Sequence, residues 1–145
     1  MARHNNLTVA DIQERIGRSS FHQLFRPEVL AVDNDAMTLE LKVHMCPQFE
    51  RQPGTGQWHG GVLASLVDIA GCYALMLVAG GQMLTLNFST DFLRLAASDH
   101  LIARARVRRA GRPPFCLPSL FLSPPFSPAV KGTAFPCNRH HIVQD

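Results

Sequence analysis

The chain has 145 residues, which is the size of one domain and excludes two independent hydrophobic cores. Hydrophobic residues make up 46% of the sequence, so wholesale disorder is excluded, and charged residues make up only 17%, which favours an oligomer that hides part of the surface. The formal net charge of +3 is too small to indicate a nucleic-acid-binding protein, and we expect no nucleic acid as a partner.

The first residues and the cysteines indicate a compartment. The start of the chain has no apolar stretch of the kind that a secretory signal needs. The four cysteines lie far apart, at positions 46, 72, 116 and 137, without the paired spacing of a zinc site. We therefore expect a cytoplasmic protein with reduced thiols and no structural metal.

The N-terminal segment predicts a short amphipathic helix over residues 8–18. Thr8 is placed to cap this helix, and Asp11 follows three residues later as a variant of the capping box. Residues 20–26 read as an apolar bridge, which Pro27 ends.

Four strands and a loop follow from the pattern of apolar side chains. Residues 28–45 predict an antiparallel hairpin that is buried on one side, because apolar and polar side chains alternate from position 37 to position 45. Residues 46–58 contain two prolines and two glycines, which predicts a loop. Residues 83–94 and 99–109 alternate again and predict two more strands of an antiparallel sheet.

A long apolar helix is predicted over residues 60–79, with Gly80 and Gly81 at its end. Residues 60–81 number 22 and carry one charge, so their length also suits a membrane span. That charge, Asp68, lies well inside the segment, where an Asp costs about 2.5–3.5 kcal/mol on insertion into a bilayer. We therefore favour a buried helix in an α+β fold with no membrane, and keep the membrane span as the alternative.

The composition changes abruptly near residue 112. Seven of the ten prolines fall in the last 33 residues, where proline interrupts every candidate strand. We therefore divide the chain into a domain over residues 1–112 and an atypical, irregular tail over residues 113–145. The change looks like translation in a shifted reading frame, a hypothesis that the nucleotide sequence tests. Such a tail leaves the sheet incomplete and one strand edge unpaired.

The segment that carries chemistry begins at the start of the long helix. Gly60 and Gly61 let another group approach the backbone there, and free N–H groups at a helix N-terminus attract developing negative charge, such as that on a thioester oxygen. Asp68 lies nine residues after His59, which is about 13 Å along a helix axis. One chain cannot bring both groups to one substrate atom. Two antiparallel helices from two subunits can, so the spacing predicts a dimer with shared sites.

These residues resemble a known family. The motif His59-Gly60-Gly61, followed by Ser65-Leu66-Val67-Asp68 in an apolar helix and then by a strand that begins near Thr85, resembles the hotdog-fold acyl-CoA thioesterases. The resemblance is to the phenylacetic-acid-degradation (PaaI-like) type, and it covers about residues 20–111. It implies an α+β hotdog fold, in which an antiparallel sheet wraps a long central helix and two protomers join their sheets edge to edge.

The resemblance also implies a set of catalytic roles. The N–H of Gly61, or a neighbouring N–H of the same turn such as that of Gly60, polarises the thioester carbonyl. Asp68 of the partner subunit acts as the nucleophile or as the general base toward water, Thr85 positions that water, and His59 orients the turn. The substrate is an acyl-CoA or another pantetheine thioester, the assembly is a homodimer or homotetramer, and no cofactor is expected beyond the coenzyme A of the substrate.

The loop before the motif departs from the family. Many relatives carry an Asn six residues before the motif histidine, where this chain has Pro53. Gln52 is the nearest amide and is our candidate substitute, Arg51 is a candidate for contact with the coenzyme A phosphates, and Trp58 is a candidate for substrate contact. A simpler interpretation makes Trp58 an anchor of the loop.

Each candidate also has a structural interpretation. Asp68 as a merely structural residue needs a buried partner, and the two glycines as structural residues permit close helix packing. Arg104, Arg106 and Arg108 share one face of a predicted strand, and we interpret this face as solvated, with phosphate binding as the alternative. For the whole chain, the alternative to a hydrolase is a non-catalytic hotdog protein that binds acyl thioesters or serves assembly, or an inactive truncated relative.

Overall fold

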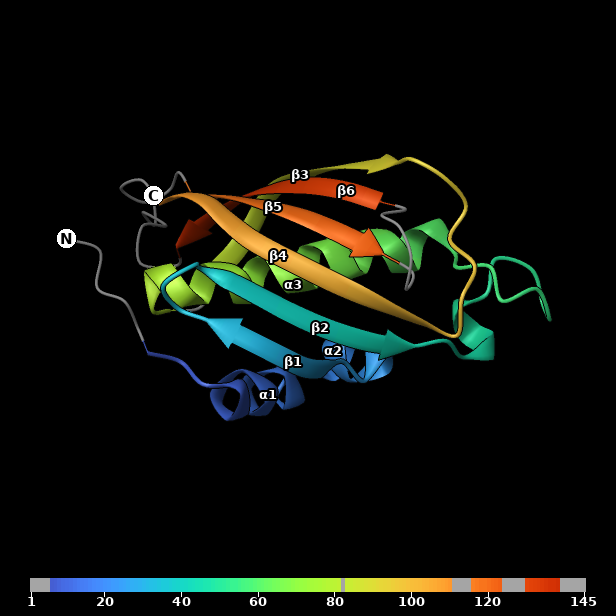
Figure 1. The fold of residues 1–145 in the computed structure, drawn as a ribbon, viewed down its shortest axis with the longest axis horizontal. Coiled ribbons are helices and arrows are strands. Elements are labelled where there is room, and N and C mark those ends of the chain that lie inside the picture. Colours follow the sequence, from blue (N-terminus) through green and yellow to red (C-terminus); the bar gives the residue numbers. More distant parts are fainter. Residues whose placement is uncertain (1–5, 82, 111–115, 124–129, 139–145) are drawn as a thin grey trace, which may run out of the picture.

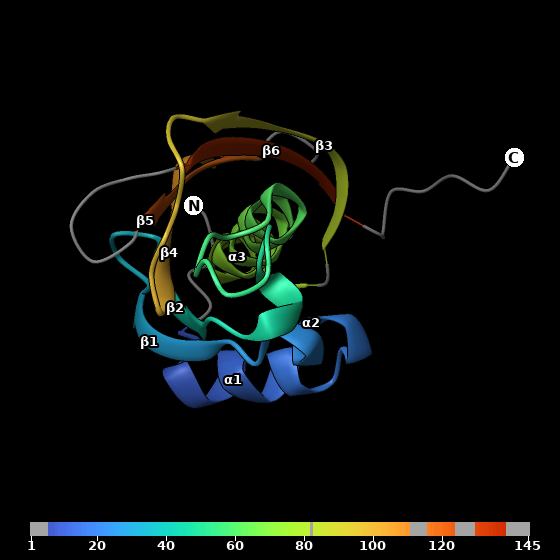
Figure 2. The same cartoon turned by 90° about the vertical axis from the view of Figure 1, so that its right-hand side faces the viewer.

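The computed structural model describes residues 6–81, 83–110, 116–123 and 130–138 (Figure 1). Helix α3, Gly60–Ala79, lies in the hollow of a six-stranded antiparallel sheet with the strand order β1-β2-β4-β5-β6-β3. Figure 2, which looks along the helix, shows the sheet curving around α3 while α1 and α2 lie beside β1. The predicted α+β architecture, a long central helix in an antiparallel sheet, is confirmed.

Helix α1, Val9–Gly17, starts as the sequence predicts. The Thr8 hydroxyl accepts a hydrogen bond from the Asp11 N–H, and the Asp11 carboxylate accepts one from the Thr8 N–H at 2.7 Å. This reciprocal capping box satisfies two N–H groups that a helix start leaves without partners. Ile12 and Ile16, one turn apart, are buried and attach the helix to the core.

The segment that we interpreted as an apolar bridge is a second helix, α2, Ser20–Phe25. The Ser19 hydroxyl caps it by accepting from the His22 N–H at 3.3 Å. The helix ends at Arg26, whose φ of 44° is left-handed, directly before Pro27. The sequence analysis missed this helix because its six residues are too few for a clear period.

Strands β1, Glu28–Asp33, and β2, Thr38–His44, form the predicted hairpin. Leu39, Leu41 and Val43 are at most 1% exposed and face α3, so the alternation in the sequence identified the buried side of the sheet. The loop after β2 contains one short turn of 3-10 helix that the sequence analysis did not predict.

Strands β3, Met83–Phe92, and β4, His100–Ala110, lie on opposite sides of the sheet centre. Both were predicted, with ends that differ by one or two residues. The buried side chains of β4 alternate along the strand: Leu101, Ala103, Ala105 and Val107. The arginines between them (Arg104, Arg106 and Arg108) are exposed, as expected for a solvated face.

The prediction of an irregular tail is wrong for two stretches, because β5, Cys116–Ser123, and β6, Val130–Asn138, lie between β4 and β3 in the sheet. The prolines misled the prediction, since Pro118 pairs with Val107 and Pro136 pairs with Thr85 at register shifts in the two ladders. A bulge tolerates a residue without an N–H. The sheet therefore includes this segment, and the rest of residues 113–145 lies outside the described residues.

A glycine lets β6 lie close to the central helix. A Cβ built on Gly132 would come within 2.4 Å of the Val67 Cγ1 atom, closer than real atoms approach. The residue is buried where β6 crosses α3, and only a hydrogen at this position fits. The C-terminal segment is thus fitted to the same helix that carries Asp68.

Helix α3 is long and apolar enough to cross a membrane, with a mean hydropathy of 2.1. Its buried side chains include Leu66, Ile69, Leu75 and Leu77, which contact the concave side of the sheet. The same composition is expected of a helix surrounded by its own protein. α3 is therefore the core helix of the fold.

The two edges of the open sheet, β1 and β3, differ in their surroundings. β1 contacts α1 on its outer side, whereas β3 contacts α3 and pairs with β6, and no other described strand lies along its outer edge. Large apolar side chains are exposed on β3 and just after it: Leu86 (66%), Phe88 (38%), Phe92 (54%), Leu93 (58%) and Leu95 (54%). An apolar edge strand of this kind is normally covered by a partner.

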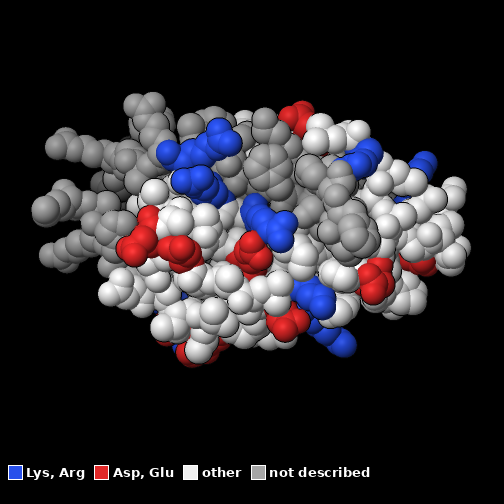
Figure 3. Space-filling view, viewed as in Figure 1, with Lys and Arg blue, Asp and Glu red and all other residues white. Residues whose placement is uncertain are grey.

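The outer side of β2 and β4 has a different character. Figure 3 shows basic and acidic side chains interspersed over this face, rather than gathered by sign. One pair crosses the two strands, because the Arg104 Nε donates to the Glu40 Oε1 at 2.7 Å. This mixture of charges is that of a solvated surface.

Candidate active site

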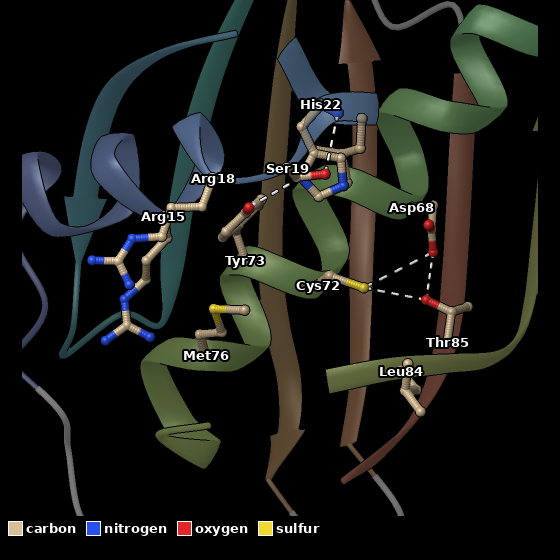
Figure 4. A pocket seen from close by; sticks show the side chains of 11 residues that line it. Arg15, Arg18, Ser19, His22, Asp68, Cys72, Tyr73, Met76, Leu84 and Thr85 are labelled. Carbon is tan, nitrogen blue, oxygen red and sulfur yellow. Dashed lines mark hydrogen bonds between the residues drawn. The ribbon is translucent and has the colours of Figure 1, made fainter. Parts of the chain in front are cut away.

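A cavity of about 530 Å³ lies between α3, the α1–α2 segment and the start of β3. Three kinds of side chain line it, as Figure 4 shows: a carboxylate with a hydroxyl and a thiol at one end, a histidine and a tyrosine in the middle, and arginines at the other end. The lining residues are Arg15, Arg18, Ser19, His22, Asp68, Ile69, Cys72, Tyr73, Met76, Leu84 and Thr85.

Asp68 and Thr85, predicted separately from the sequence, meet in this cavity. The Thr85 hydroxyl donates to the Asp68 Oδ1 at 2.5 Å, and Cys72 lies beside both (Figure 4). The Cys72 Sγ is 3.2 Å from the Thr85 Oγ1 and 3.9 Å from the Asp68 Oδ1. Asp68 and Cys72 share a helix face because they are four residues apart.

The hydrogen bonds among Cys72, Thr85 and Asp68 run toward the carboxylate. Thr85 has one proton and gives it to Asp68, so Cys72 is the donor in its 3.2 Å contact with Thr85. The second carboxylate oxygen of Asp68, Oδ2, accepts no hydrogen bond from the part of the chain that the structure describes. Asp68 is therefore oriented through one oxygen and has the other open to the cavity.

Burial keeps the thiol of this trio protonated. Desolvation raises the pKa of Cys72 to about 11, and the neighbouring Asp68 carboxylate acts in the same direction. A thiol with this pKa is a weak nucleophile at neutral pH, since the thiolate is the reactive form. Cys72 is thus a hydrogen-bond donor that supports Thr85.

The middle of the cavity holds a second polar pair. The His22 Nδ1 lies 3.0 Å from the Tyr73 Oη, and the two rings meet edge to face, with centroids 5.5 Å apart. Burial lowers the pKa of His22, although the nearby Asp68 charge opposes this shift, and burial raises the pKa of Tyr73. Both side chains are therefore neutral at neutral pH.

The glycine turn lies at the start of α3, with His59 as its N-cap. The His59 Nδ1 accepts a hydrogen bond from the Gly61 N–H at 3.0 Å, so the ring of this side chain occupies one of the predicted donors. A Cβ on Gly61 would lie 3.1 Å from the same nitrogen. A glycine at this position gives the histidine room to cap the helix.

The neighbouring donor remains open. No described residue accepts a hydrogen bond from the Gly60 N–H, which is the first of the helix. A Cβ on Gly60 would meet only the Phe92 ring, at 3.7 Å, which is ordinary contact. Of the two glycines, Gly60 thus has the N–H that is available to a substrate oxygen.

The open donor and the carboxylate are far apart within one chain. Gly60 and Asp68 are eight residues apart on a continuous helix, which is about 12 Å along its axis. Gly60 does not line the cavity that contains Asp68. A single protomer therefore does not bring these two groups to one atom.

The candidates in the loop before the motif lie outside the cavity. Arg51 and Gln52 are exposed, in a loop that Glu50 holds by accepting from the Gly54 and Gly56 N–H groups, both at 2.7 Å. Trp58 is 1% exposed, and its Nε1 donates to Ser98. Trp58 thus occupies the position of a loop anchor, which was the simpler interpretation of the sequence.

Pro53 takes up no space in the cavity either, since it lies at the exposed tip of the same loop. The residue therefore leaves the arrangement of Asp68 and Thr85 unaffected within the protomer. No group of three potential metal ligands occurs among the residues that the structure describes.

Nine of the eleven lining residues were not predicted as site residues, and four of these carry polar groups that the site uses: Arg15, His22, Cys72 and Tyr73. Cys72 had a signal in the sequence, because it lies one helical turn after Asp68. The other three had none, since the packing of the α1–α2 segment against α3 brings residues about 50 positions apart into contact.

Comparisons with known proteins agree with this architecture. Residues 55–114 match the family model described as the thioesterase superfamily. No sequence among the curated proteins matches the chain.

Solved structures with the same fold cover nearly the whole chain. A Bordetella bronchiseptica protein from the thioesterase superfamily is 25% identical, with a TM-score of 0.82, over 90% of this chain and 98% of that one. A Ralstonia eutropha protein named as a putative thioesterase related to phenylacetic acid degradation is 26% identical, with a TM-score of 0.75, over 88% and 98%.

A more distant structure shows the same architecture. A Haemophilus influenzae thioesterase is 20% identical, with a TM-score of 0.79, over 97% of this chain and 100% of that one. The chain thus has the hotdog fold of the thioesterase superfamily, a long central helix in an open antiparallel sheet, and residues 55–114 match the model of that superfamily.

Proposed function

We propose that the protein is a thioesterase that hydrolyses an acyl-CoA, or a related pantetheine thioester, to the free acid and the thiol. One observation carries the proposal: Asp68, held through Oδ1 by Thr85, presents Oδ2 to a cavity of about 530 Å³. The superfamily match and the thioesterase names of similar structures support thioester hydrolysis in general. On the motif, we place the protein with the PaaI-like type, in the cytoplasm.

In the proposed reaction Asp68 acts as a general base. Its Oδ2 accepts a proton from a water molecule while the water oxygen adds to the thioester carbon and the carbonyl oxygen becomes an oxyanion. The tetrahedral intermediate then collapses, the carbon–sulfur bond breaks, and the leaving sulfur takes the proton from Asp68. Direct attack by the carboxylate is the alternative route, through an anhydride that water cleaves.

Stabilisation of the oxyanion requires a donor beside Asp68, and the Gly60 N–H of the same chain lies about 12 Å away along α3. We assign this role to the Gly60 N–H of the partner subunit, since that N–H has no acceptor in the described part of its own chain. His59 holds the adjacent turn by accepting from the Gly61 N–H. Thr85 orients Asp68 and, through its remaining lone pair, the attacking water.

The apolar edge of β3 supports a homodimer. Its exposed side chains, Leu86 and Phe88 among them, follow the strand at the open edge of the sheet. Pairing two such edges antiparallel satisfies their open N–H and C=O groups and brings two α3 helices side by side. Two of these dimers can form a tetramer. Coenzyme A enters only as part of the substrate, and the exposed Arg51 and Gln52 remain our weaker candidates for contact with it, whereas Trp58 is buried as the anchor of the loop.

The direct test is hydrolysis of a panel of acyl-CoA thioesters, with phenylacetyl-CoA and medium-chain acyl-CoAs included, measured by release of the free thiol. We expect turnover by a dimer or tetramer in size-exclusion chromatography. The substitution Asp68→Asn keeps the shape of the side chain and removes the base, so it should lower kcat by about 10²- to 10⁴-fold.

Two other results would change the assignment. A soluble oligomer that binds acyl-CoA without turnover, with the same affinity in Asp68→Asn, would identify the non-catalytic binding protein. Full turnover in Asp68→Asn would contradict the role of Asp68 while leaving the activity in place.

A further inference from the structure

We propose that the cavity selects an acyl group that ends in a carboxylate, so that the substrate is the monothioester of a dicarboxylic acid. This inference rests on the proposed thioesterase function, and it names the substrate class of the same site. The recognising groups are the guanidinium of Arg15, at the opposite end of the cavity from the reacting carbonyl, and the hydroxyl of Tyr73, in its middle (Figure 4).

The negative and positive side chains of the cavity lie at opposite ends. Asp68 is the only acidic residue among those that line it, and it lies at the end with Thr85 and Cys72 (Figure 4). Arg15 and Arg18 lie side by side at the other end. An acyl group that carries a negative charge away from its thioester matches this arrangement, because its charge is distant from Asp68 and close to the cations.

The two arginines differ in what already binds them. Arg18 forms an ion pair with Glu14, one turn earlier on α1, and is exposed. Arg15 is half-buried, and no described carboxylate lies within ion-pair distance of it, although its charge acts on Asp11, one turn earlier on α1. A half-buried guanidinium with no carboxylate in contact has unused donors, and a bidentate carboxylate is the partner that fits them best.

Tyr73 provides a second polar group, in the middle of the cavity (Figure 4). Its side chain is 4% exposed, its hydroxyl is held by His22 at 3.0 Å, and its ring lies within the electrostatic influence of Arg15. When the His22 Nδ1–H donates to the Tyr73 oxygen, the Tyr73 O–H remains available to donate to a substrate oxygen. This wall of the cavity thus offers a polar group to an acyl chain that carries an acceptor.

The length of the cavity sets the length of the substrate. Asp68, Cys72 and Met76 mark three successive turns of α3 along its floor, which is about 12 Å from first to last. Met76 and Leu84 supply apolar contacts for the methylene groups between the two ends. An acyl chain with several methylene groups therefore extends along this floor, away from Asp68.

The test compares pairs of thioesters that differ in the terminal group alone: adipyl-CoA with hexanoyl-CoA, and glutaryl-CoA with valeryl-CoA. We expect kcat/KM to favour the carboxylate member by about ten- to a hundredfold, the range of a charge-assisted hydrogen bond. Arg15→Gln should lower this ratio to about one, whereas Arg15→Lys should retain part of it because the charge is kept.

Matched controls separate recognition from general effects. Arg106→Gln removes an exposed arginine of β4 on the outside of the sheet and should leave the ratio unchanged. Tyr73→Phe should lower the ratio less than Arg15→Gln does, since it removes a neutral group. If Arg15 binds the coenzyme A phosphates instead, Arg15→Gln will weaken all thioesters by the same factor, which overturns the proposal.

A binding measurement keeps the inference separate from the activity. Calorimetric titration of the Asp68→Asn protein with adipyl-CoA and hexanoyl-CoA gives the same ratio without turnover. Tighter binding of adipyl-CoA that is lost in Asp68→Asn/Arg15→Gln supports the inference even if no thioester is hydrolysed. Equal binding, or a preference for hexanoyl-CoA, overturns the inference even if hydrolysis is fast.

Discussion

The start and the middle of α3 contribute to the proposed reaction in different ways. The start supplies a backbone N–H at Gly60, which has no described acceptor and needs no particular side chain. The middle supplies Asp68, whose position depends on Thr85 and Cys72. In the proposed site, the donor to the oxyanion is thus positioned by backbone geometry, whereas the general base is positioned by side-chain contacts.

The largest effect after loss of Asp68 is expected from Gly60→Pro. Proline removes the N–H and suits the first position of a helix, and His59 before it has an extended backbone with ψ of 136°, which proline accepts. Loss of one oxyanion donor should lower kcat by about 10²- to 10³-fold, measured by thiol release with the folded state followed by circular dichroism.

The matched control is Gly60→Ala, which keeps the N–H. Its Cβ meets only the Phe92 ring at 3.7 Å, so we expect normal folding and nearly normal turnover. Equal loss of kcat in Gly60→Ala and Gly60→Pro would show that the glycine is needed for space, and would refute a role for its N–H.

A smaller loss of kcat is expected from Thr85→Val, a substitution on β3 that acts on Asp68 in the middle of α3. The substitution keeps the shape of the side chain and removes the hydrogen bond to the Asp68 Oδ1. Hydrogen bonds to charged groups are worth about 1.5–3 kcal/mol, so we expect kcat to fall by about one to two powers of ten. Cys72→Ala, which removes only the donor behind Thr85, should cost less, and a larger loss in Cys72→Ala would contradict the direction assigned to this network.

The packing of β6 against the middle of α3, at Gly132 and Val67, predicts an effect on the stability of the folded protein. Gly132→Ala brings a Cβ to within 2.4 Å of the Val67 Cγ1, and overpacking of this kind costs about 1–3 kcal/mol of unfolding free energy. Urea unfolding of Gly132→Ala, Val67→Ala and the double variant forms a cycle. We expect Val67→Ala to relieve the cost of Gly132→Ala. Additive losses would show that β6 does not pack on α3 at this point.

The smallest effect is a dependence of stability on pH through His22. Burial lowers the pKa of His22 in the folded protein from its ordinary 6.5, so the unfolded chain binds more protons just below that pH. Stability contributed by neutral His22 is therefore complete above about pH 7 and declines as the pH falls through 6.5. Melting temperatures between pH 5 and pH 8 should fall more steeply in the wild type than in His22→Gln. Parallel curves would contradict the assignment.

The N-terminal and central elements could be predicted because each carries a local signal. The hairpin alternates, α3 is apolar nearly all round, and Thr8 and Asp11 mark a helix start. The strands β5 and β6 could not be predicted in this way, because their prolines lie at register shifts that exist only once the strands are paired. Tertiary pairing thus overrides a local signal that is otherwise reliable.

The candidate site was predictable in part for the same reason. A glycine pair before an apolar helix, and a single carboxylate within it, stand out in any sequence. The hydrogen bond from Thr85 to Asp68 joins positions 17 apart, and the His22–Tyr73 pair joins positions 51 apart, so neither contact has a spacing that a sequence reveals. The choice of Gly60 over Gly61 as the open donor also required the His59 side chain to be seen in place.

Mixed dimers test most directly the claim that the start of one α3 and the middle of another form one site. Gly60→Pro and Asp68→Asn protomers, each inactive alone, are to be co-expressed with different affinity tags, and the doubly tagged dimer assayed for acyl-CoA hydrolysis. A shared site predicts that activity returns, because each mixed dimer contains one site with an intact Gly60 N–H and an intact Asp68. A mixed dimer as inactive as its parents would contradict the account and place both groups in the site of a single chain.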